Sequence, residues 1–367
     1  MSVPLRAAAL ALAAALTGAC ASHSELRITP VGRYDFEGGG SEDPALTAEE
    51  LSGLAPLGGD RYVAVSDEHA TVHFLRIEVD PDSGTIVAAS FEGLLVLRDG
   101  AGMPLEDGHG ASDREGIVAD TAAGLLWISH ESAGPAAEYP AIAVHRLDSG
   151  YLEQTIDPAS EPGLRVFFRL RGNRGFESLT RSPDGREAWT ANEETLTADG
   201  PPPDGARGAL VRLQRMDGEF RPLAQYAYEV DPITALIEFP PQLRGREASG
   251  VSDLLALPGG VLLVLEREFG AAENGIPANR IRIYRADWKG ATDVSKGALA
   301  EGLEGRAFRT VKKTRLAELV FPLSNSNFEG IALGPRLANG ERSLILIADN
   351  HSGTQQALYA LRLSGLE

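Results

Sequence analysis

Carboxylate side chains bracket a short apolar pattern that recurs along this sequence. The stretch FESLTRSPDGREAWTANEE, residues 176–194, places Glu177 before one apolar strand and Glu193 after the next, with a tight turn between them. Because the start of one strand and the end of its antiparallel neighbour lie at the same edge of a sheet, we expect the two acids to lie close together. Grouped carboxylates can coordinate a hard cation such as Ca²⁺ or exchange protons with a substrate.

The same order of residues returns in four further segments, which begin at Glu50, Arg114, Glu247 and Asn327. Each has an acid, an apolar strand, a turn and a second apolar strand that closes on an acid. We expect the first strands to start at the acids Glu50, Glu115, Glu177, Glu247 and Glu329, and the second strands to end at Asp67, Glu131, Glu193, Glu266 and Asp349. A hairpin that recurs in this way is typical of a fold built from repeated units.

Further strands are expected after these hairpins. Alternating apolar and polar residues predict third strands at 72–79, 141–147, 209–215, 280–286 and 357–363. Weaker patterns predict fourth strands at 90–98, 165–171, 224–230 and 315–321, with an orphan strand at 27–36. Four-stranded antiparallel units repeated radially make a β-propeller. The orphan strand can complete the last unit, so we expect the two chain ends to close the ring together.

The expected fold is therefore all-β, a single β-propeller domain over residues 26–367. Five blades carry the acidic motif, and a sixth blade without the motif is left open in the interval between Arg267 and Phe321. In a propeller, equivalent ends of the innermost strands face the same mouth of the central channel. The acids of the motif should therefore converge at one mouth.

A ring of acids needs neutralising charge, because like charges a few ångströms apart raise one another's pKa. Arginines that flank the motif could supply it, namely Arg114, Arg174, Arg267 and Arg280. The alternative is a hard cation such as Ca²⁺, which would also find amide oxygens on Asn173, Asn192, Asn327 and Asn350. A third interpretation is purely structural: the acids accept backbone N–H groups at strand ends, and recur because the blade recurs.

Three of the seven histidines adjoin the acids that end second strands, namely His69, His130 and His351. Imidazoles beside carboxylates can bind a transition metal or act as general acid–base groups. The bland alternative is that polar residues gather where a strand leaves the core. The sequence has no G-x-S-x-G, S-x-x-K or H-E-x-x-H motif and no Gly-rich phosphate loop, so it offers no support for a covalent serine mechanism or nucleotide binding.

The formal net charge of −18 argues against nucleic acid as a partner, because binding phosphate backbones requires a basic face. The first residues, MSVPLRAAALALAAALTGACAS, have the layout of a secretory signal, so we expect 1–21 to direct export to the periplasm, the cell envelope or the medium. The only cysteine, Cys20, lies in LTGAC, which resembles a bacterial lipobox. Lipidation of Cys20 would anchor the mature chain to a membrane, and ordinary signal cleavage is the alternative. We expect a monomer.

Three segments resemble the bacterial phytase-like family, also called esterase-like activity of phytase. They are GFESLTRSPDGREAW, SGVSDLLALPGGVLLVLEREFGAAENGIPANRIRIYR and NFEGIALGPRLANGERSLILIADN. The resemblance covers most of the mature chain and implies a secreted β-propeller with a hydrolytic role on phosphate or carboxylate esters. It directs attention to the positions that match the motifs, namely Glu177, Ser249, Asp253, Glu266, Arg267, Asn279, Arg280, Glu329 and Asp349.

One departure bears on the substrate. Calcium-dependent β-propeller phytases carry Asp-Asp-Pro-Ala motifs and many lysines that face the substrate. In this sequence only SEDPALT, with Glu42 and Asp43, is similar, and lysine is restricted to Lys289, Lys296, Lys312 and Lys313. The sequence therefore disfavours phytate and leaves smaller phosphate esters, or other esters, open.

The leading hypothesis is an exported hydrolase that binds Ca²⁺ at the mouth and acts on a small anionic or ester substrate. We expect catalytic roles for Glu177, Glu329, Glu266, His130 and His351, and substrate contacts from Arg267, Arg280, Asn279, Ser249 and Arg174. The expected metal ligands are Glu115, Glu131, Glu193, Asp253, Asp349 and Asp67. The rival hypotheses are a non-catalytic binding propeller of the cell envelope and a calcium-dependent lactonase-type propeller.

Overall fold

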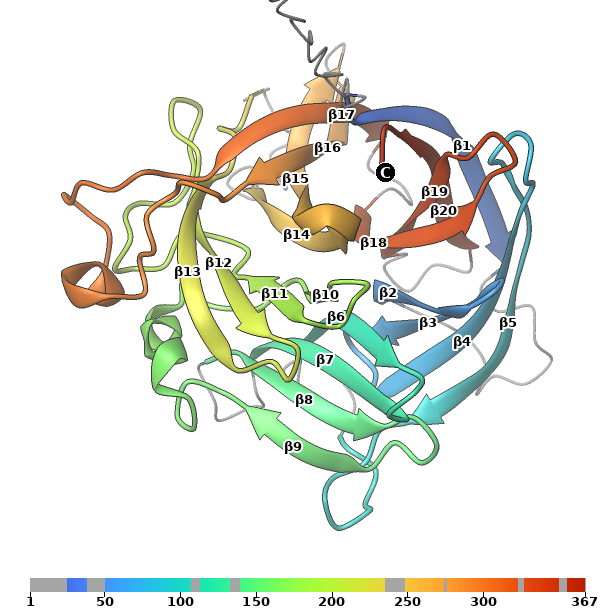
Figure 1. Cartoon of the computed structure of the whole chain (residues 1–367), viewed down its shortest axis with the longest axis horizontal. Coiled ribbons are helices and arrows are strands. Elements are labelled where there is room, and N and C mark those ends of the chain that lie inside the picture. Colours follow the sequence, from blue (N-terminus) through green and yellow to red (C-terminus); the bar gives the residue numbers. More distant parts are fainter. Residues whose placement is uncertain are drawn as a thin grey trace, which may run out of the picture.

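The chain folds into a ring of antiparallel sheets (Figure 1). The structure is a computed structural model that describes residues 25–37, 50–106, 113–132, 139–234, 248–273, 276–322, 327–349 and 355–366. Within these ranges the strands form five four-stranded sheets, which are the blades of a β-propeller. The predicted fold class is confirmed, and the number of blades is five. The signal segment 1–21 and Cys20 lie outside the described residues.

The first four blades each follow the chain from the channel outward. Blade 1 contains β2 (Leu51–Gly58), β3 (Arg61–Ser66), β4 (Thr71–Val79) and β5 (Ile86–Val96). Blade 2 contains β6 (Asp113–Asp120), β7 (Leu125–Ser132), β8 (Ala141–Arg146) and β9 (Leu152–Ile156). Blade 3 contains β10 (Thr180–Arg181), β11 (Glu187–Ala191), β12 (Leu210–Asp217) and β13 (Pro222–Glu229). Blade 4 contains β14 (Ala248–Leu257), β15 (Val261–Glu273), β16 (Ile276–Asp287) and β17 (Lys312–Pro322).

The two chain ends share blade 5. This sheet contains β18 (Asn327–Arg336), β19 (Arg342–Asp349) and β20 (Gln355–Ser364), and its outermost strand is β1 (Arg27–Glu37). The β1–β20 pairing runs from Arg27 opposite Ser364 to Glu37 opposite Gln355. The prediction that the orphan strand closes the ring is confirmed.

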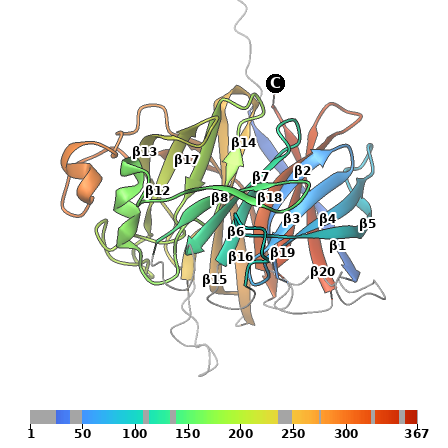
Figure 2. The same cartoon turned by 90° about the horizontal axis from the view of Figure 1, so that it is seen from below.

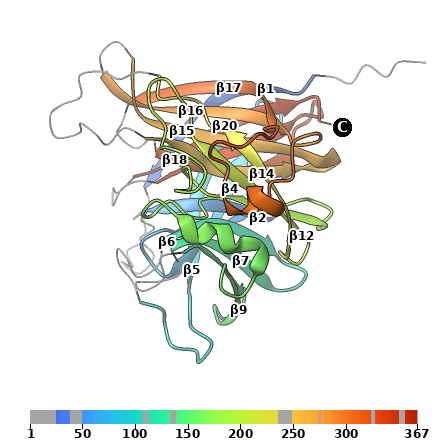
Figure 3. The ribbon, with the colours of Figure 1, turned by 90° about the vertical axis from the view of Figure 1, so that its left-hand side faces the viewer.

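The described residues between Arg267 and Phe321 do not form a sixth blade. They include β16 and β17, which are the outer strands of blade 4, and between them a connection with the short 3₁₀ helix η5 (Gly297–Glu301). This connection packs Val294 and Leu303 against Ala227 of β13. The additional residues of this connection therefore pack against the outside of blade 3, as Figures 1 and 3 show.

The prediction of a strand at 165–171 was wrong. These residues belong mostly to the 3₁₀ helix η2 (Pro162–Arg169), and β9 is the outermost strand of blade 2. Pro162 suits the first turn of a helix, where its missing N–H removes no hydrogen bond. Leu164 and Phe167, three residues apart, are both fully buried, which is the period of a 3₁₀ helix.

The core lies between neighbouring blades, where both faces of each sheet are covered. One cluster packs Leu263 and Leu265 of blade 4 against Phe328 and Leu344 of blade 5. Near the channel the innermost strands approach so closely that a side chain would not fit: a Cβ on Gly116 would lie 2.2 Å from the backbone N of Leu179. Figure 2 shows the blades from the side. No helix in the described ranges is long and apolar enough to cross a membrane.

Candidate functional site

Two rings of side chains surround one mouth of the channel. The innermost strand of each blade has one residue more than its partner near its start, which is a β-bulge. The residues at this position form the inner ring: Ser52, Glu115, Glu177, Ser252 and Glu329. The residues where the second strands reach the mouth form the outer ring: Asp67, Glu131, Glu193, Arg267 and Asp349.

Blade 4 breaks the pattern that the sequence predicted. Val251 pairs with Glu266 and donates its N–H to the Glu193 carbonyl, as Arg114 donates to the Asp67 carbonyl. Ser252 is therefore the equivalent of the inner-ring glutamates, and Arg267, one residue after Glu266, takes the outer-ring position. A shift of one residue turns a strand side chain to the opposite face, so Glu266 leaves the mouth.

The first blade also differs by two residues. The motif position there belongs to Ser52, and Glu50 precedes it with φ of 52° in the left-handed region. Glu247, expected at the equivalent position of blade 4, lies outside the described residues. The sequence signal for the correct alignment is an apolar or arginine residue, then Glu or Ser, then a small residue or Asp, then Leu or Ile.

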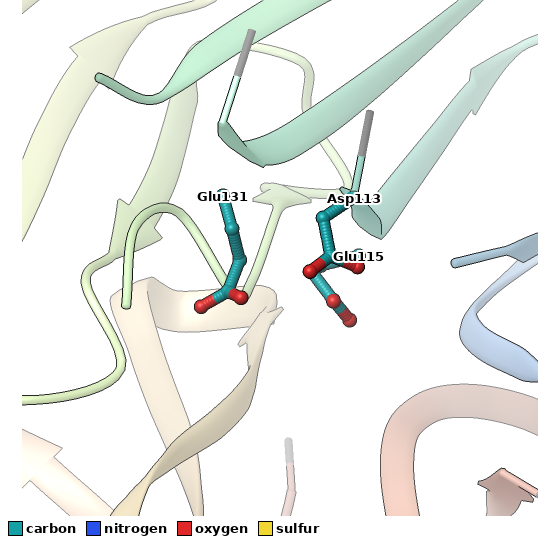
Figure 4. A group of neighbouring side chains, drawn as sticks. All are labelled: Asp113, Glu115 and Glu131. Atoms are coloured by element: carbon teal, nitrogen blue, oxygen red, sulfur yellow. The ribbon is translucent and has the colours of Figure 1, made fainter. Parts of the chain in front are cut away.

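The acids of the two rings, together with Asp113, form the carboxylate cluster, which we define as Asp67, Asp113, Glu115, Glu131, Glu177, Glu193, Glu329 and Asp349. Within the cluster, two groups of three acids share Glu131. The first is Asp113, Glu115 and Glu131, and the second is Glu131, Glu177 and Glu193. In each group, one carboxylate oxygen of every member lies within 4.8 Å of those of the other two. Figure 4 shows the first group, with the three carboxylates turned toward a common space. Asp113 was missed by the sequence analysis, although it lies two residues before Glu115 in SDREG.

The cluster is buried and strongly self-repelling. Glu115, Glu131 and Glu177 are 6%, 4% and 4% exposed. Burial, and then the charges of neighbouring carboxylates, raise the pKa of all three glutamates well above the usual range. Burial and the charges of Asp349 and Glu329 raise the pKa of Asp67 to about 9. Ionising the whole cluster therefore requires a positive charge beyond that of its neighbours.

Arginine supplies part of that charge. Arg267 forms ion pairs with Glu329, with Glu193 at 3.3 Å and with Glu177 at 3.8 Å, and it also donates to the Asn327 side-chain oxygen. Arg174 pairs with Glu193, and its side chain is 38% exposed, so it is partly accessible to solvent. These contacts lie on the side of blades 3 to 5, whereas Asp113, Glu115 and Asp67 lie on blades 1 and 2.

The donor set fits a hard cation. Ca²⁺ prefers several carboxylate oxygens, which both groups around Glu131 provide. Glu131 Oε1 and Asp67 Oδ1 are buried and have no hydrogen-bond partner among the described residues. A buried acceptor without a donor is costly, and a cation would satisfy it. The cluster could therefore hold a metal ion.

Other predicted site residues lie away from the cluster. Glu266 accepts from Tyr228 at 2.6 Å and from Lys313 at 2.7 Å, between the outer strands of blades 3 and 4. Ser249 donates to the Asp231 carbonyl at 3.0 Å. Arg280 pairs with Glu318 at 3.2 Å on the outer part of blade 4, and the neighbouring Asn279 is buried on β16.

Asp253 and His130 are both buried, in surroundings that give them a structural role. Asp253 accepts the backbone N–H groups of Leu254 at 2.7 Å and of Ile331 at 2.8 Å, so it joins blades 4 and 5, and burial raises its pKa to about 8. His130 is buried, and burial followed by the charge of Arg114 lowers its pKa well below the usual value. His351 lies outside the described residues.

A model of the phytase-like family, described as esterase-like activity of phytase, matches residues 47–351. No curated protein matches.

Solved structures with distant similarity include two proteins described as sugar dehydrogenases. The PQQ-bound aldose sugar dehydrogenase from Streptomyces coelicolor is 11% identical, with 93% of this chain and 99% of that chain covered and a TM-score of 0.38. A putative glucose dehydrogenase from Thermus thermophilus is 12% identical, with 92% and 100% covered and a TM-score of 0.39.

Proposed function

Because the chain belongs to the phytase-like family, we propose that it is a metal-dependent ester hydrolase that binds Ca²⁺ in its carboxylate cluster. The observation that carries this proposal is the pair of acidic groups that share Glu131, whose buried Oε1 has no hydrogen-bond partner among the described residues. Phosphate esters and carboxylate esters are the proposed substrate class, since both present an oxygen that a cation can polarise.

Each part of the site has a proposed role. Asp113, Glu115 and Glu131, together with Glu193, would hold the ion. When bound, the ion would polarise the scissile ester and acidify a water molecule. Glu177, which lies beside Glu131 and Glu193, would accept a proton from that water. Arg267 positions Glu329, and Arg174, at the exposed edge, would contact an anionic group of the substrate.

A second candidate function has its own support. The glutamates of the cluster are almost fully buried, which favours a cation that only stabilises the propeller and leaves binding to the surrounding surface. Under this alternative the protein binds a ligand at the cell envelope without turning it over. Both candidates require Ca²⁺ binding, and only the first requires catalysis.

The test combines binding with turnover. Ca²⁺ affinity is measured by calorimetry, and hydrolysis of p-nitrophenyl phosphate, p-nitrophenyl acetate, phytate and a simple lactone is measured with Ca²⁺ and with chelator. We compare wild type, Glu131→Gln and the exposed control Glu304→Gln. Loss of both binding and calcium-dependent turnover in Glu131→Gln alone supports the hydrolase. Ca²⁺ binding without turnover supports the second candidate, and no Ca²⁺ binding rejects both.

We propose export as well, and the fold would then set the orientation of the protein relative to the membrane. Arg27 of β1 pairs with Ser364, at the end of blade 5 opposite the mouth, since Asp349 and Gln355 mark the mouth end. A lipid on Cys20 would therefore attach a monomer to the membrane by its far end and leave the carboxylate cluster facing away. Replacing Cys20 by Ser should move the protein from the membrane fraction to the soluble fraction, with its mass in solution that of one chain.

A further inference from the structure

The far end of the channel contains a cavity of about 340 Å³ that the proposed function does not use. Residues from the middle and later parts of the innermost strands of all five blades line it, together with the turns that follow β6 and β10. The carboxylate cluster lies at or before the starts of the same strands and at the mouth ends of the second strands. The two sites therefore lie at opposite ends of the propeller, and an inference about the cavity is independent of the hydrolase proposal.

The walls of the cavity are apolar on three sides. Blades 1, 4 and 5 contribute aliphatic side chains and one proline, among them Leu54, Pro56, Leu255 and Leu333. Its volume lies within the range of about 300–1,000 Å³ that is usual for small-molecule sites. The rim includes Thr121 and Ala122, which are exposed to solvent.

Polar groups converge on the remaining side, from blades 2 and 3. Arg181 pairs with Asp120 at 2.5 Å through Nη1, while its Nε is buried and has no hydrogen-bond partner among the described residues. Thr180 Oγ1 accepts the N–H of Ala256 at 3.0 Å, which leaves its hydroxyl hydrogen to be donated. Two donors thus lie beside an apolar space.

The charge balance determines which head group fits these donors. The Arg181–Asp120 pair is neutral as a whole, and Asp120 would repel an added anion. A cation would have to compete for Asp120 with two donors, since Oδ2 already pairs with Arg181 and Oδ1 accepts the Ala123 N–H. A neutral acceptor such as a carbonyl oxygen avoids both costs and satisfies the buried Nε–H, whose unpaired state is unfavourable.

We propose that this cavity binds a small neutral amphiphile, with its apolar body against the aliphatic walls and a carbonyl oxygen toward Arg181 and Thr180. The site combines an apolar pocket with a few convergent polar groups, as ligand sites do. The cavity end is also the end at which β1 begins, so a lipid anchor on Cys20 would bring the site near a membrane, where such molecules concentrate.

The probe for the test is Prodan, a neutral naphthalene ketone whose emission shifts to the blue in apolar surroundings. We expect saturable binding of one molecule per chain. Ala119→Phe, in the cavity wall, should abolish the shift, and Ala122→Phe, at the exposed rim, should weaken it even if the first variant fails to fold. Val87→Phe adds the same side chain at an exposed position of β5 and should bind like wild type.

The polar side is tested separately. Arg181→Lys keeps a cation for Asp120 but removes the Nε–H, and should weaken Prodan binding about tenfold, the effect of one hydrogen bond to a charged group. In competition, 2-octanone should displace Prodan at lower concentration than octanoate. Absence of saturable binding, or binding unchanged in both cavity variants, would overturn the proposal. Stronger competition by octanoate would overturn the assignment of a neutral head group.

Discussion

At the residue scale, the mouth concentrates negative charge that must be compensated. Among the described ion pairs, two arginines face the eight carboxylates of the cluster. Arg174 pairs with Glu193. Arg267 pairs with Glu177, Glu193 and Glu329, and it also donates to Asn327. The other four blades carry an acid where blade 4 carries Arg267. This single exchange of charge holds three glutamates from blades 3 and 5, and it leaves the acids of blades 1 and 2 available for a cation.

Arg267→Met tests that role. Removing one partner of a buried ion pair leaves uncompensated charge, so the free energy of unfolding in chelator should fall by about 3–5 kcal/mol. Urea denaturation with and without Ca²⁺ measures it. A loss below about 1 kcal/mol would show that Arg267 does not neutralise the glutamates.

Asp67 gives a prediction about pH. Its folded-state pKa of about 9 lies above the ordinary value of 3.8, so the folded protein binds this proton more tightly than the unfolded chain does. The associated stability is present in full below pH 4 and is lost as pH rises toward 9, at up to about 1.4 kcal/mol per pH unit.

In chelator, Asp67→Asn should therefore be more stable than wild type at pH 8, by about 1 kcal/mol or more, and equal to it near pH 4. Urea denaturation at the two pH values measures this difference. The exposed control is Asp184→Asn on the turn after β10. If Asp67→Asn is less stable at pH 8, the carboxylate is compensated in a way that the structure does not show.

At the element scale, the sequence predicted nearly all strands but not their register at the mouth. The hairpins of blades 2, 3 and 5 were aligned correctly because Glu115, Glu177 and Glu329 are followed by Gly or Ser. In blades 1 and 4 a serine occupies the motif position, and a glutamate nearby satisfied the same pattern. The alternation of apolar and polar residues could not fix the register of LEREF, residues 265–269, because residues on both faces of β15 are buried.

The close approach of innermost strands gives an element-scale prediction. A Cβ on Gly116 would meet the backbone of Leu179 and Ser178, which cannot move without shifting β10. Gly116→Ala should lower the free energy of unfolding by about 1–3 kcal/mol or more. Gly93→Ala on β5 is the control, since nothing lies within 4 Å of its Cβ position. Equal urea midpoints for the two variants would contradict a fixed spacing between blades.

At the scale of the whole molecule, one pairing holds the ring closed. β1 and β20 join residues that are more than 300 positions apart, and every other blade is formed by consecutive strands. The repeat made this closure predictable, because the last unit lacked one strand and the chain began with one unassigned. The position of the far cavity was not predictable, since it depends on which side chains leave space at the axis.

A disulfide across the closure should stabilise the ring. Thr29 lies opposite Arg362 in the β1–β20 ladder. In a chain with Cys20→Ser, the pair Thr29→Cys and Arg362→Cys should be more stable oxidised than reduced, by about 2–4 kcal/mol, because the crosslink restricts the unfolded chain. Thermal unfolding of the two redox forms of the same variant provides the comparison. Equal stability would mean that the ring opens elsewhere first.

The closing strand also determines when folding can be completed during synthesis. β1 leaves the ribosome early, and β20 is completed only at Ser364, on the order of tens of seconds later at about 5–20 residues per second. Until then blade 5 lacks its central ladder and the ring stays open. Under the proposed export this delay would be useful, because a chain that cannot finish folding before its last strand is synthesised remains a substrate for a translocation channel that accepts only unfolded polypeptide.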